Sequence, residues 1–589
     1  MSLIENQMKM TQKQIKKLQS LLFSDDLSFV KQGLMLWEML LPTDDLALFQ
    51  RQIRLASGHK EDSSPNPLKD IHDLREIWSQ APQGNHLSIW TLEVLATFPE
   101  SGIEQLEELS LAIFHLPELP EFIFSLSNLK ALDLEENRLT EIPIGLESLS
   151  CLEQLDLSNN QLAQTEVELQ LPALRWLDLS FNRLQCIPLF VFQSHSLSEL
   201  YLSENRISKI DDNIGALSEL QTLYLEDNRL SSLPESFSRL TALRDVQVSS
   251  NRLKTLPPSL SLLSNLQTLD LSYNHLKEII FPENFSSLVE LHLRGNLLSC
   301  VDSSVEQLRH LEKFSLSANP ILTFPDTFQK LACLIELNLS QINLEKHSLD
   351  NIDSIFRNIS PLSSLQHLNL SSNSLGNISS KAREIIFDYL SQIERLSSLS
   401  LSDNDLRELP SSFSRMSALQ TLNYSDNLLG KLEPRVQQES LMQILMLPVL
   451  KDLNLSYNHL SVLPNQLHRH DQLEKIDLTG NAIQTLPSGF AHLEQLKHLS
   501  LQDNPIAYQD PEKCTQLFHT ISNISGLKHL NLAGTQLSKA SLSSFEQGFT
   551  LLSMNLSLET LKTHGNNLNN EKISILKRCF PHTQLKLHQ

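Results

Sequence analysis

Residues 129–143 read L-K-A-L-D-L-E-E-N-R-L-T-E-I-P, and this stretch decides the fold because its pattern returns along the chain. The frame L-x-x-L-x-L-x-x-N-x-L occurs 19 times, and its asparagine position runs from residue 114 to residue 566. Successive positions are 22 or 23 residues apart thirteen times and 31 residues apart five times. A period of this size predicts one stack of similar turns in place of several unrelated domains.

Each frame predicts a short strand. In L-x-L the two leucines point to one side and the residue between them to the other, so the strand has an apolar face and a polar face. A buried asparagine can satisfy backbone groups of its own turn and of the neighbouring turn. We therefore predict a structural ladder of amides, formed in the first half by Asn137, Asn160, Asn182, Asn205, Asn228, Asn251, Asn274, Asn296 and Asn319. Phe114, Ile342 and Thr535 replace the amide, and we expect less regular packing there.

These frames resemble the leucine-rich repeat family, over about residues 100 to 589. The resemblance implies an α/β fold, a right-handed solenoid or horseshoe of about 19 repeats with a parallel sheet on its concave side. Short repeats of 22 or 23 residues are expected over 101–342. Residues 343–589 mix 23-residue and 31-residue repeats, the latter similar to the ribonuclease-inhibitor type, with apolar spacing that predicts a true helix. A closing helix and a half-repeat, Gln584 to Leu587, are expected at the end.

Residues 1–100 lack the frame. Their apolar spacing predicts helices over 12–23, 26–41 and 44–55, and 57–66 is a polar linker. We interpret this region as a helical N-terminal cap, because an open solenoid end exposes its core. The alternative is a separate docking or delivery module.

The chain carries 47 Lys and Arg against 69 Asp and Glu, a formal net charge of −22. Such a surface repels phosphate backbones and anionic lipids, so it favours a basic protein partner over nucleic acid or membrane. The polar start of the chain has no signal-peptide pattern. Its cysteines form no CxxC pair, which predicts a reducing, cytoplasmic setting; they are Cys151, Cys186, Cys300, Cys333, Cys514 and Cys579.

Catalytic motifs are not found, and no enzyme activity or cofactor is expected. One match needs explanation. Bacterial leucine-rich-repeat ubiquitin ligases, which these repeats resemble, use a Cys-x-Asp motif, and Cys300-Val301-Asp302 has that form. Val301 occupies an apolar frame position, however, so we place the tripeptide inside a repeat. His498 and His529 occupy the same position in adjacent turns and could share a metal, but no third ligand is apparent and no metal site is expected.

The concave face of the first half mixes aromatic rings with carboxylates. This composition is typical of a binding surface for a protein with Lys or Arg anchors. Tyr201 and Tyr224 hold identical positions in consecutive turns, and Trp176 and Glu199 form a similar pair. The predicted partner-binding residues are Trp176, Asp178, Phe181, Glu199, Tyr201, Glu204, Tyr224, Glu226, Asp227 and Tyr273. Aspartate is also a common filler of this frame, so single aspartates carry less weight than Trp176.

The sequence therefore predicts a non-catalytic scaffold or regulator that binds a basic protein on its concave face. Two alternatives remain open. One is a bacterial effector that acts on host proteins, which the similarity of the short repeats to effector repeats suggests. The other is an enzyme built on repeats, either a ubiquitin ligase or a GTPase-activating protein.

Overall fold

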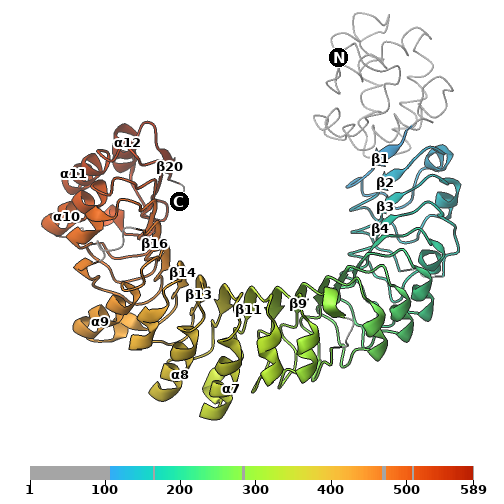
Figure 1. Cartoon of the computed structure of the whole chain (residues 1–589). Coiled ribbons are helices and arrows are strands. Elements are labelled where there is room, and N and C mark those ends of the chain that lie inside the picture. Colours follow the sequence, from blue (N-terminus) through green and yellow to red (C-terminus); the bar gives the residue numbers. More distant parts are fainter. Residues whose placement is uncertain (1–105, 164–165, 282–284, 467–471, 507–509, 588–589) are drawn as a thin grey trace, which may run out of the picture. The chain divides into compact units, whose positions relative to one another are not determined.

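The computed structural model describes residues 106–163, 166–281, 285–466, 472–506 and 510–587. The helices expected within 1–100 lie outside these ranges. The chain divides into two compact units, Met1–Leu266 and Gln267–Gln589. Figure 1 labels strands and helices of both units. The change of repeat type expected at residues 342–343 falls inside the second unit.

In the first unit, seven three-residue strands pair in parallel with their neighbours in chain order. They are β1 (Glu108–Ser110), β2 (Ala131–Asp133), β3 (Gln154–Asp156), β4 (Trp176–Asp178), β5 (Glu199–Tyr201), β6 (Thr222–Tyr224) and β7 (Asp245–Gln247).

The second unit has thirteen strands with the same parallel, in-order pairing. They are β8 (Thr268–Asp270), β9 (Glu290–His292), β10 (Lys313–Ser315), β11 (Glu336–Asn338), β12 (His367–Asn369), β13 (Ser398–Ser400), β14 (Thr421–Asn423), β15 (Asp452–Asn454), β16 (Lys475–Asp477), β17 (His498–Ser500), β18 (His529–Asn531), β19 (Thr560–Lys562) and β20 (Gln584–Lys586). Among the described residues, nineteen strands come from the nineteen frames, and β20 lies in the segment Gln584 to Leu587 that follows them.

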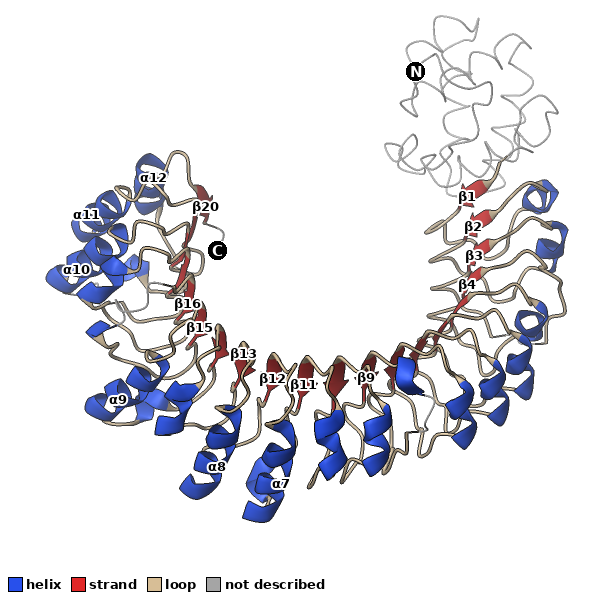
Figure 2. Cartoon of the chain, viewed as in Figure 1, coloured by secondary structure: helices blue, strands red, loops and turns tan. Residues whose placement is uncertain are grey.

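Every strand has two faces, as the L-x-L pattern predicts. In β4, for example, Leu177 is buried while Trp176 and Asp178 are partly exposed. The first and third residues of the strands, which are partly or fully exposed, form a surface that we call the strand face. The middle residues form the core against the helical side of each unit (Figure 2).

The helical side changes with repeat length. Each of the five 31-residue intervals contains an α-helix, and one more follows residue 566. They are α7 (Leu349–Ile359), α8 (Ser380–Leu390), α9 (Pro434–Ile444), α10 (Pro511–Ser522), α11 (Leu542–Leu552) and α12 (Asn570–Cys579).

The short repeats have room only for a 3-10 helix, which often begins directly after a proline that fixes φ. Those of the first unit are η3 (Glu121–Ser125), η4 (Ile144–Ser148), η5 (Leu189–Gln193), η6 (Asp212–Ala216), η7 (Glu235–Arg239) and η8 (Pro258–Leu262). The 3-10 helices of the second unit, in short and long repeats alike, are η9 (Phe285–Ser287), η10 (Ser303–Gln307), η11 (Asp326–Lys330), η12 (Leu344–Lys346), η13 (Ser411–Arg415), η14 (Leu429–Lys431), η16 (Ser488–His492) and η17 (Leu537–Lys539). Three of these short helices, η12, η14 and η17, precede the α-helices of long repeats.

The ladder asparagines are buried and join consecutive repeats. Asn228 is representative, because its Nδ2 donates to the carbonyl of Leu202 in the preceding repeat (2.9 Å) and to that of Leu225 in its own (3.2 Å). Its Oδ1 accepts from the backbone N–H of Ile207 at 2.8 Å. One side chain thus bonds to the backbone of two repeats and supplies the partner of the Ile207 N–H. The two carbonyls are shared with neighbouring ladder asparagines, since Leu202 also accepts from Asn205 and Leu225 from Asn251.

The frames of Ile342 and Thr535, which lack the asparagine, were expected to pack less regularly. For the register of their strands this expectation was wrong. β11 and β18 pair with both neighbours in the same register as the other strands. At Ile342 the backbone N–H is satisfied by Asn373 Oδ1 of the next repeat (3.0 Å). At Thr535 the hydroxyl replaces the amide and donates to the Leu532 carbonyl (2.7 Å).

Among the residues that the structure describes, no helix is both long and apolar enough to span a bilayer.

Candidate functional site

Three aromatic rings contact one another in a continuous row on the strand face of the first unit. Trp176 begins β4, and Tyr201 and Tyr224 end β5 and β6. Register places Tyr201 directly beside Tyr224, as the sequence spacing predicts. The ring centroids of Trp176 and Tyr201 are 5.5 Å apart, and those of Tyr201 and Tyr224 are 5.0 Å apart in an edge-to-face arrangement. We call these three residues the aromatic cluster.

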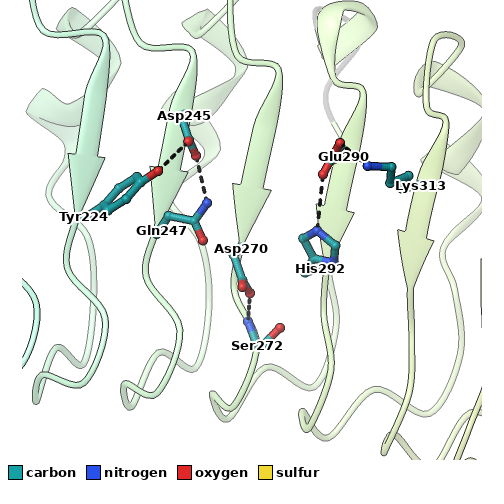
Figure 3. Close-up of polar contacts among 8 residues, drawn as sticks. All are labelled: Tyr224, Asp245, Gln247, Asp270, Ser272, Glu290, His292 and Lys313. Atoms are coloured by element: carbon teal, nitrogen blue, oxygen red, sulfur yellow. Dashed lines mark hydrogen bonds and ion pairs between the residues drawn. The ribbon is translucent and has the colours of Figure 1, made fainter. Parts of the chain in front are cut away.

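The tyrosine hydroxyls of the cluster are held by carboxylates. Tyr201 donates to Glu199 Oε2 at 2.7 Å and Tyr224 to Asp245 Oδ2 at 2.8 Å. Gln247 donates to the other oxygen of Asp245 at 2.9 Å, so this carboxylate lies between two donors (Figure 3). Burial and the bond to Glu199 raise the pKa of Tyr201 to about 12, and burial and Asp245 raise the pKa of Tyr224 as well. Both rings are therefore neutral and fixed in orientation at physiological pH.

A column of carboxylates runs beside the cluster. Asp133, Asp156 and Asp178 are paired in register at the ends of β2, β3 and β4. Burial raises the pKa of Asp156 and of Asp178, and repulsion from neighbouring carboxylates adds to the effect. The pKa of Glu135 rises for the same two reasons. A positive charge placed here would relieve this repulsion.

Asp178 also has a structural role that the sequence analysis did not assign. Its Oδ1 accepts the backbone N–H of Ser180, two residues on, at 2.7 Å. Asn338 and Asn454 make the same bond at the equivalent position of other repeats. The bond explains why the frame favours Asp or Asn at this position, so the presence of Asp178 does not by itself indicate a binding site.

The remaining predicted residues lie in the turns that follow the strands. Glu226 comes two residues after β6 and accepts a hydrogen bond from Ser203 of the previous repeat. Phe181, Glu204 and Asp227 immediately precede ladder asparagines and have positive φ angles of 55°, 54° and 51°. The Phe181 side chain is 52% exposed. These four residues line the edge of the strand face and do not belong to the aromatic cluster.

Tyr273 belongs to the second unit, so it is not grouped with the aromatic cluster. Its side chain is 50% exposed, and the Arg294 guanidinium lies 5.6 Å from the ring centroid. The ring passes over Gly295, where a Cβ atom would come within 2.6 Å of it. The glycine at the same frame position of the next repeat thus makes room for this tyrosine.

Asp245 and Gln247 were not among the predicted site residues, although they orient Tyr224. Aligning the strand positions of consecutive frames could have found them, because Tyr224 and Gln247 are in register. The contact between Trp176 and Tyr201 is diagonal and depends on side-chain rotamers, which the repeat pattern does not report.

The Cys300-Val301-Asp302 tripeptide lies inside a repeat, as expected. Val301 is buried, and the backbone of Cys300 forms an isolated β-bridge with Thr323. The Asp302 carboxylate caps η10 by accepting the N–H of Ser304 at 2.8 Å. These contacts give Asp302 a structural role, and they also lower its pKa.

His498 and His529 are adjacent, with ring centroids 4.4 Å apart and an interplanar angle of 19°. Imidazoles stacked face to face do not aim their ring nitrogens at one shared point. Among the described residues, no group of three or more His, Cys, Asp or Glu could hold a metal ion.

Comparison with known proteins agrees with this architecture. Leucine-rich-repeat family models match residues 104–162, 172–298 and 448–506, and further matches cover 364–383 and 395–416. Each frame forms one parallel strand and carries one asparagine or its replacement. The chain is therefore a leucine-rich-repeat protein. No curated protein matches it.

Several solved structures are similar. A leucine-rich-repeat protein of Leptospira interrogans is 22% identical, over 85% of this chain and 98% of that one, with a TM-score of 0.42. The ectodomain of the Arabidopsis thaliana receptor kinase GASSHO1/SCHENGEN3, solved with Casparian strip integrity factor 2, is 22% identical, over 82% and 70%, with a TM-score of 0.47. The functional domain of InlJ from Listeria monocytogenes is 18% identical, over 73% and 74%, with a TM-score of 0.41.

Proposed function

We propose that this protein is a non-catalytic scaffold that binds a basic protein on the strand face of its first unit, through the aromatic cluster. Leucine-rich-repeat proteins in general mediate protein–protein interaction, and their repeats generally serve as scaffolds without catalysis. The finer assignment, to this surface and to a partner with Lys or Arg anchors, is the proposal.

The observation that carries it is the row of Trp176, Tyr201 and Tyr224 on a solvent-facing sheet. Folding alone does not require large rings at these positions, since other repeats place Ser, Thr or Asn there. Tyr and Trp that are rigid before binding lose little conformational entropy in a complex and are enriched among residues that dominate binding energy.

Charge supports a basic partner. Six of the fourteen residues of this strand face are Asp or Glu, and among the described residues none is Lys or Arg. The resulting negative potential raises the rate of encounter with a cationic surface, and the aromatic cluster then slows dissociation.

The proposal places the protein in the cytoplasm, as expected from the sequence. The six cysteines, whose spacing led to that expectation, are all free thiols. It assigns no cofactor and no reaction to the chain.

The proposal can be tested by affinity capture. The full chain is immobilised and exposed to a lysate, and captured proteins are identified by mass spectrometry. The variant Trp176→Ala/Tyr201→Ala/Tyr224→Ala should lose the protein that the wild type retains, and its melting temperature should change little because these side chains lie outside the buried core.

A matched control removes exposed apolar side chains elsewhere in the same unit. Ile144, Leu189 and Leu262 are 68%, 39% and 54% exposed and lie on η4, η5 and η8. Their triple alanine variant should capture the same protein as the wild type. Undiminished capture by the aromatic variant would place the binding site elsewhere.

A further inference from the structure

The last five strands of the second unit carry a surface of opposite charge. Lys475, His498 and His529 are the first residues of β16, β17 and β18 and pair in register. Lys562 and Lys586 are the third residues of β19 and β20 and also pair in register. All five side chains belong to the strand face, and we call them the cationic patch.

The lysines of this patch have no ionic partners among the described residues. By contrast, Lys313 on β10 contacts Glu290 at 2.7 Å, and His292 lies 3.7 Å from the same carboxylate (Figure 3). Lys497 and Lys528, each one residue before a strand, are paired with Glu474 and Glu559 at 2.6 and 2.7 Å.

Like charges stand beside each other in the patch. Lys562 and Lys586 are directly opposite across a strand pair, an arrangement that disfavours folding. Lys475 pairs in register with Asp452 on one side and with His498 on the other, and His498 stacks on His529. Folding does not account for the pair of lysines, whereas a bound anion would relieve the repulsion between Lys562 and Lys586.

We propose that the cationic patch is a second binding surface, which takes a short acidic segment of a partner protein laid across β16–β20. Five strands at about 4.8 Å spacing span about 19 Å, the length of about six extended residues. A segment with several Asp or Glu side chains would place carboxylates beside Lys475, beside the histidine pair, and between Lys562 and Lys586.

An acidic polypeptide fits better than nucleic acid. The chain has a net charge of −22, so a long polyanion that extends past the patch meets repulsion from the rest of the surface. A short acidic segment reaches only the patch. This surface is independent of the aromatic cluster, so the two proposals can fail separately.

The test uses a fluorescein-labelled peptide of eight glutamates and the full chain, with binding followed by fluorescence anisotropy. The wild type should bind it, and added salt should weaken binding because the contacts are exposed. The variant Lys562→Glu/Lys586→Glu should bind at least about tenfold more weakly. The triple alanine variant of the aromatic cluster should bind as the wild type does.

The matched control is Lys346→Glu/Lys381→Glu, which changes the net charge equally at exposed lysines of η12 and α8. It should keep affinity within about twofold of the wild type. An equal loss in this control would show that only net charge matters and would overturn the proposal. So would an absence of binding by the wild type, or tighter binding of labelled octathymidylate than of octaglutamate.

The histidine pair gives a second readout. The charged and titratable groups around His498 are His529 on β18, Lys475 on β16, Asp452 on β15 and Lys497. Burial lowers the pKa of His498 most, and His529 and Lys475 lower it further. A bound carboxylate raises that pKa, so the complex holds more protons and affinity for octaglutamate should rise between about pH 7.5 and 5.5. His498→Gln/His529→Gln should abolish this rise; an unchanged pH profile would exclude the histidines from the site.

Discussion

At the scale of single residues, the ladder asparagine shows how one side chain determines the fold. Its position could be predicted from the frame, because a buried amide among leucines has to bond to the backbone. Which backbone groups it reaches depends on the spacing between turns, and the structure shows bonds to two repeats at once. Sequence also predicted Ile342 and Thr535 as exceptions, but not that the hydroxyl of Thr535 would replace the missing amide.

Replacing Asn228 by Leu should lower the free energy of unfolding by about 2–4 kcal/mol. The change leaves the carbonyls of Leu202 and Leu225 and the N–H of Ile207 buried without this partner. Urea denaturation followed by circular dichroism would measure it. Asn213→Leu, at an exposed asparagine of η6, is the control and should have little effect. A neutral Asn228→Leu variant would mean that the ladder bonds contribute little.

The carboxylates beside the aromatic cluster predict a pH dependence of binding. Because burial and mutual repulsion raise the pKa of Asp156 and Asp178, they take up protons at a higher pH than ordinary aspartates. A bound cation lowers these pKa values, so the complex holds fewer protons and affinity falls as pH falls. Dissociation constants for the captured partner at about pH 7.5 and pH 5 should show this weakening.

The variant Asp156→Asn/Asp178→Asn provides the control for that effect. Asparagine preserves the backbone bond, as Asn338 does in its own repeat. We expect weaker binding at neutral pH, a flatter pH profile and a melting temperature no lower than that of the wild type. Tighter binding by this variant would argue against a cationic partner.

At the scale of elements, repeat length predicts the type of helix, and long polar side chains fasten the α-helices to the preceding turns. Arg383 of α8 donates to three carbonyls, the nearest being Ile378 at 2.8 Å. Gln437 of α9 bonds to two carbonyls of its own repeat. Lys572 of α12 bonds to three carbonyls of the previous repeat, in the turn that precedes α11. The 31-residue spacing predicted these helices. It did not predict the side chains that donate to the backbone carbonyls, because Arg, Gln and Lys all do so and no single residue type marks the position.

Arg383→Met should destabilise the protein by about 1–3 kcal/mol, because the three carbonyls lose their donor. Arg383→Lys should retain most of the stability, since Lys572 shows that an ammonium group can bond to three such carbonyls, although it does so from the next repeat. Lys381→Met, at an exposed position of the same helix, is the control. Urea denaturation would measure all three variants. If Arg383→Met and Lys381→Met had equal stability, the capping bonds would not contribute.

At the scale of the whole molecule, nearly all of the repeat architecture follows from the sequence, because every turn repeats the same pattern of leucines and a ladder residue. It predicted much less of the binding surface. Strand positions could be aligned, and they placed Tyr201 beside Tyr224. The diagonal contact of Trp176, the anchoring of Tyr224 by Asp245 and the structural bond of Asp178 depend on side-chain orientation. The cationic patch could have been found by the same alignment, since its residues occupy equivalent strand positions.

The most direct measurement is the dissociation constant of the captured partner for two single variants of the full chain. Trp176→Ala removes the ring that begins the aromatic cluster, and Ile144→Ala removes an exposed apolar side chain of η4. We predict that Trp176→Ala weakens binding roughly thirtyfold, the size typical of a residue that dominates an interface, and that Ile144→Ala stays within about twofold. Unchanged affinity in Trp176→Ala, with a large loss in Ile144→Ala, would contradict binding on the strand face.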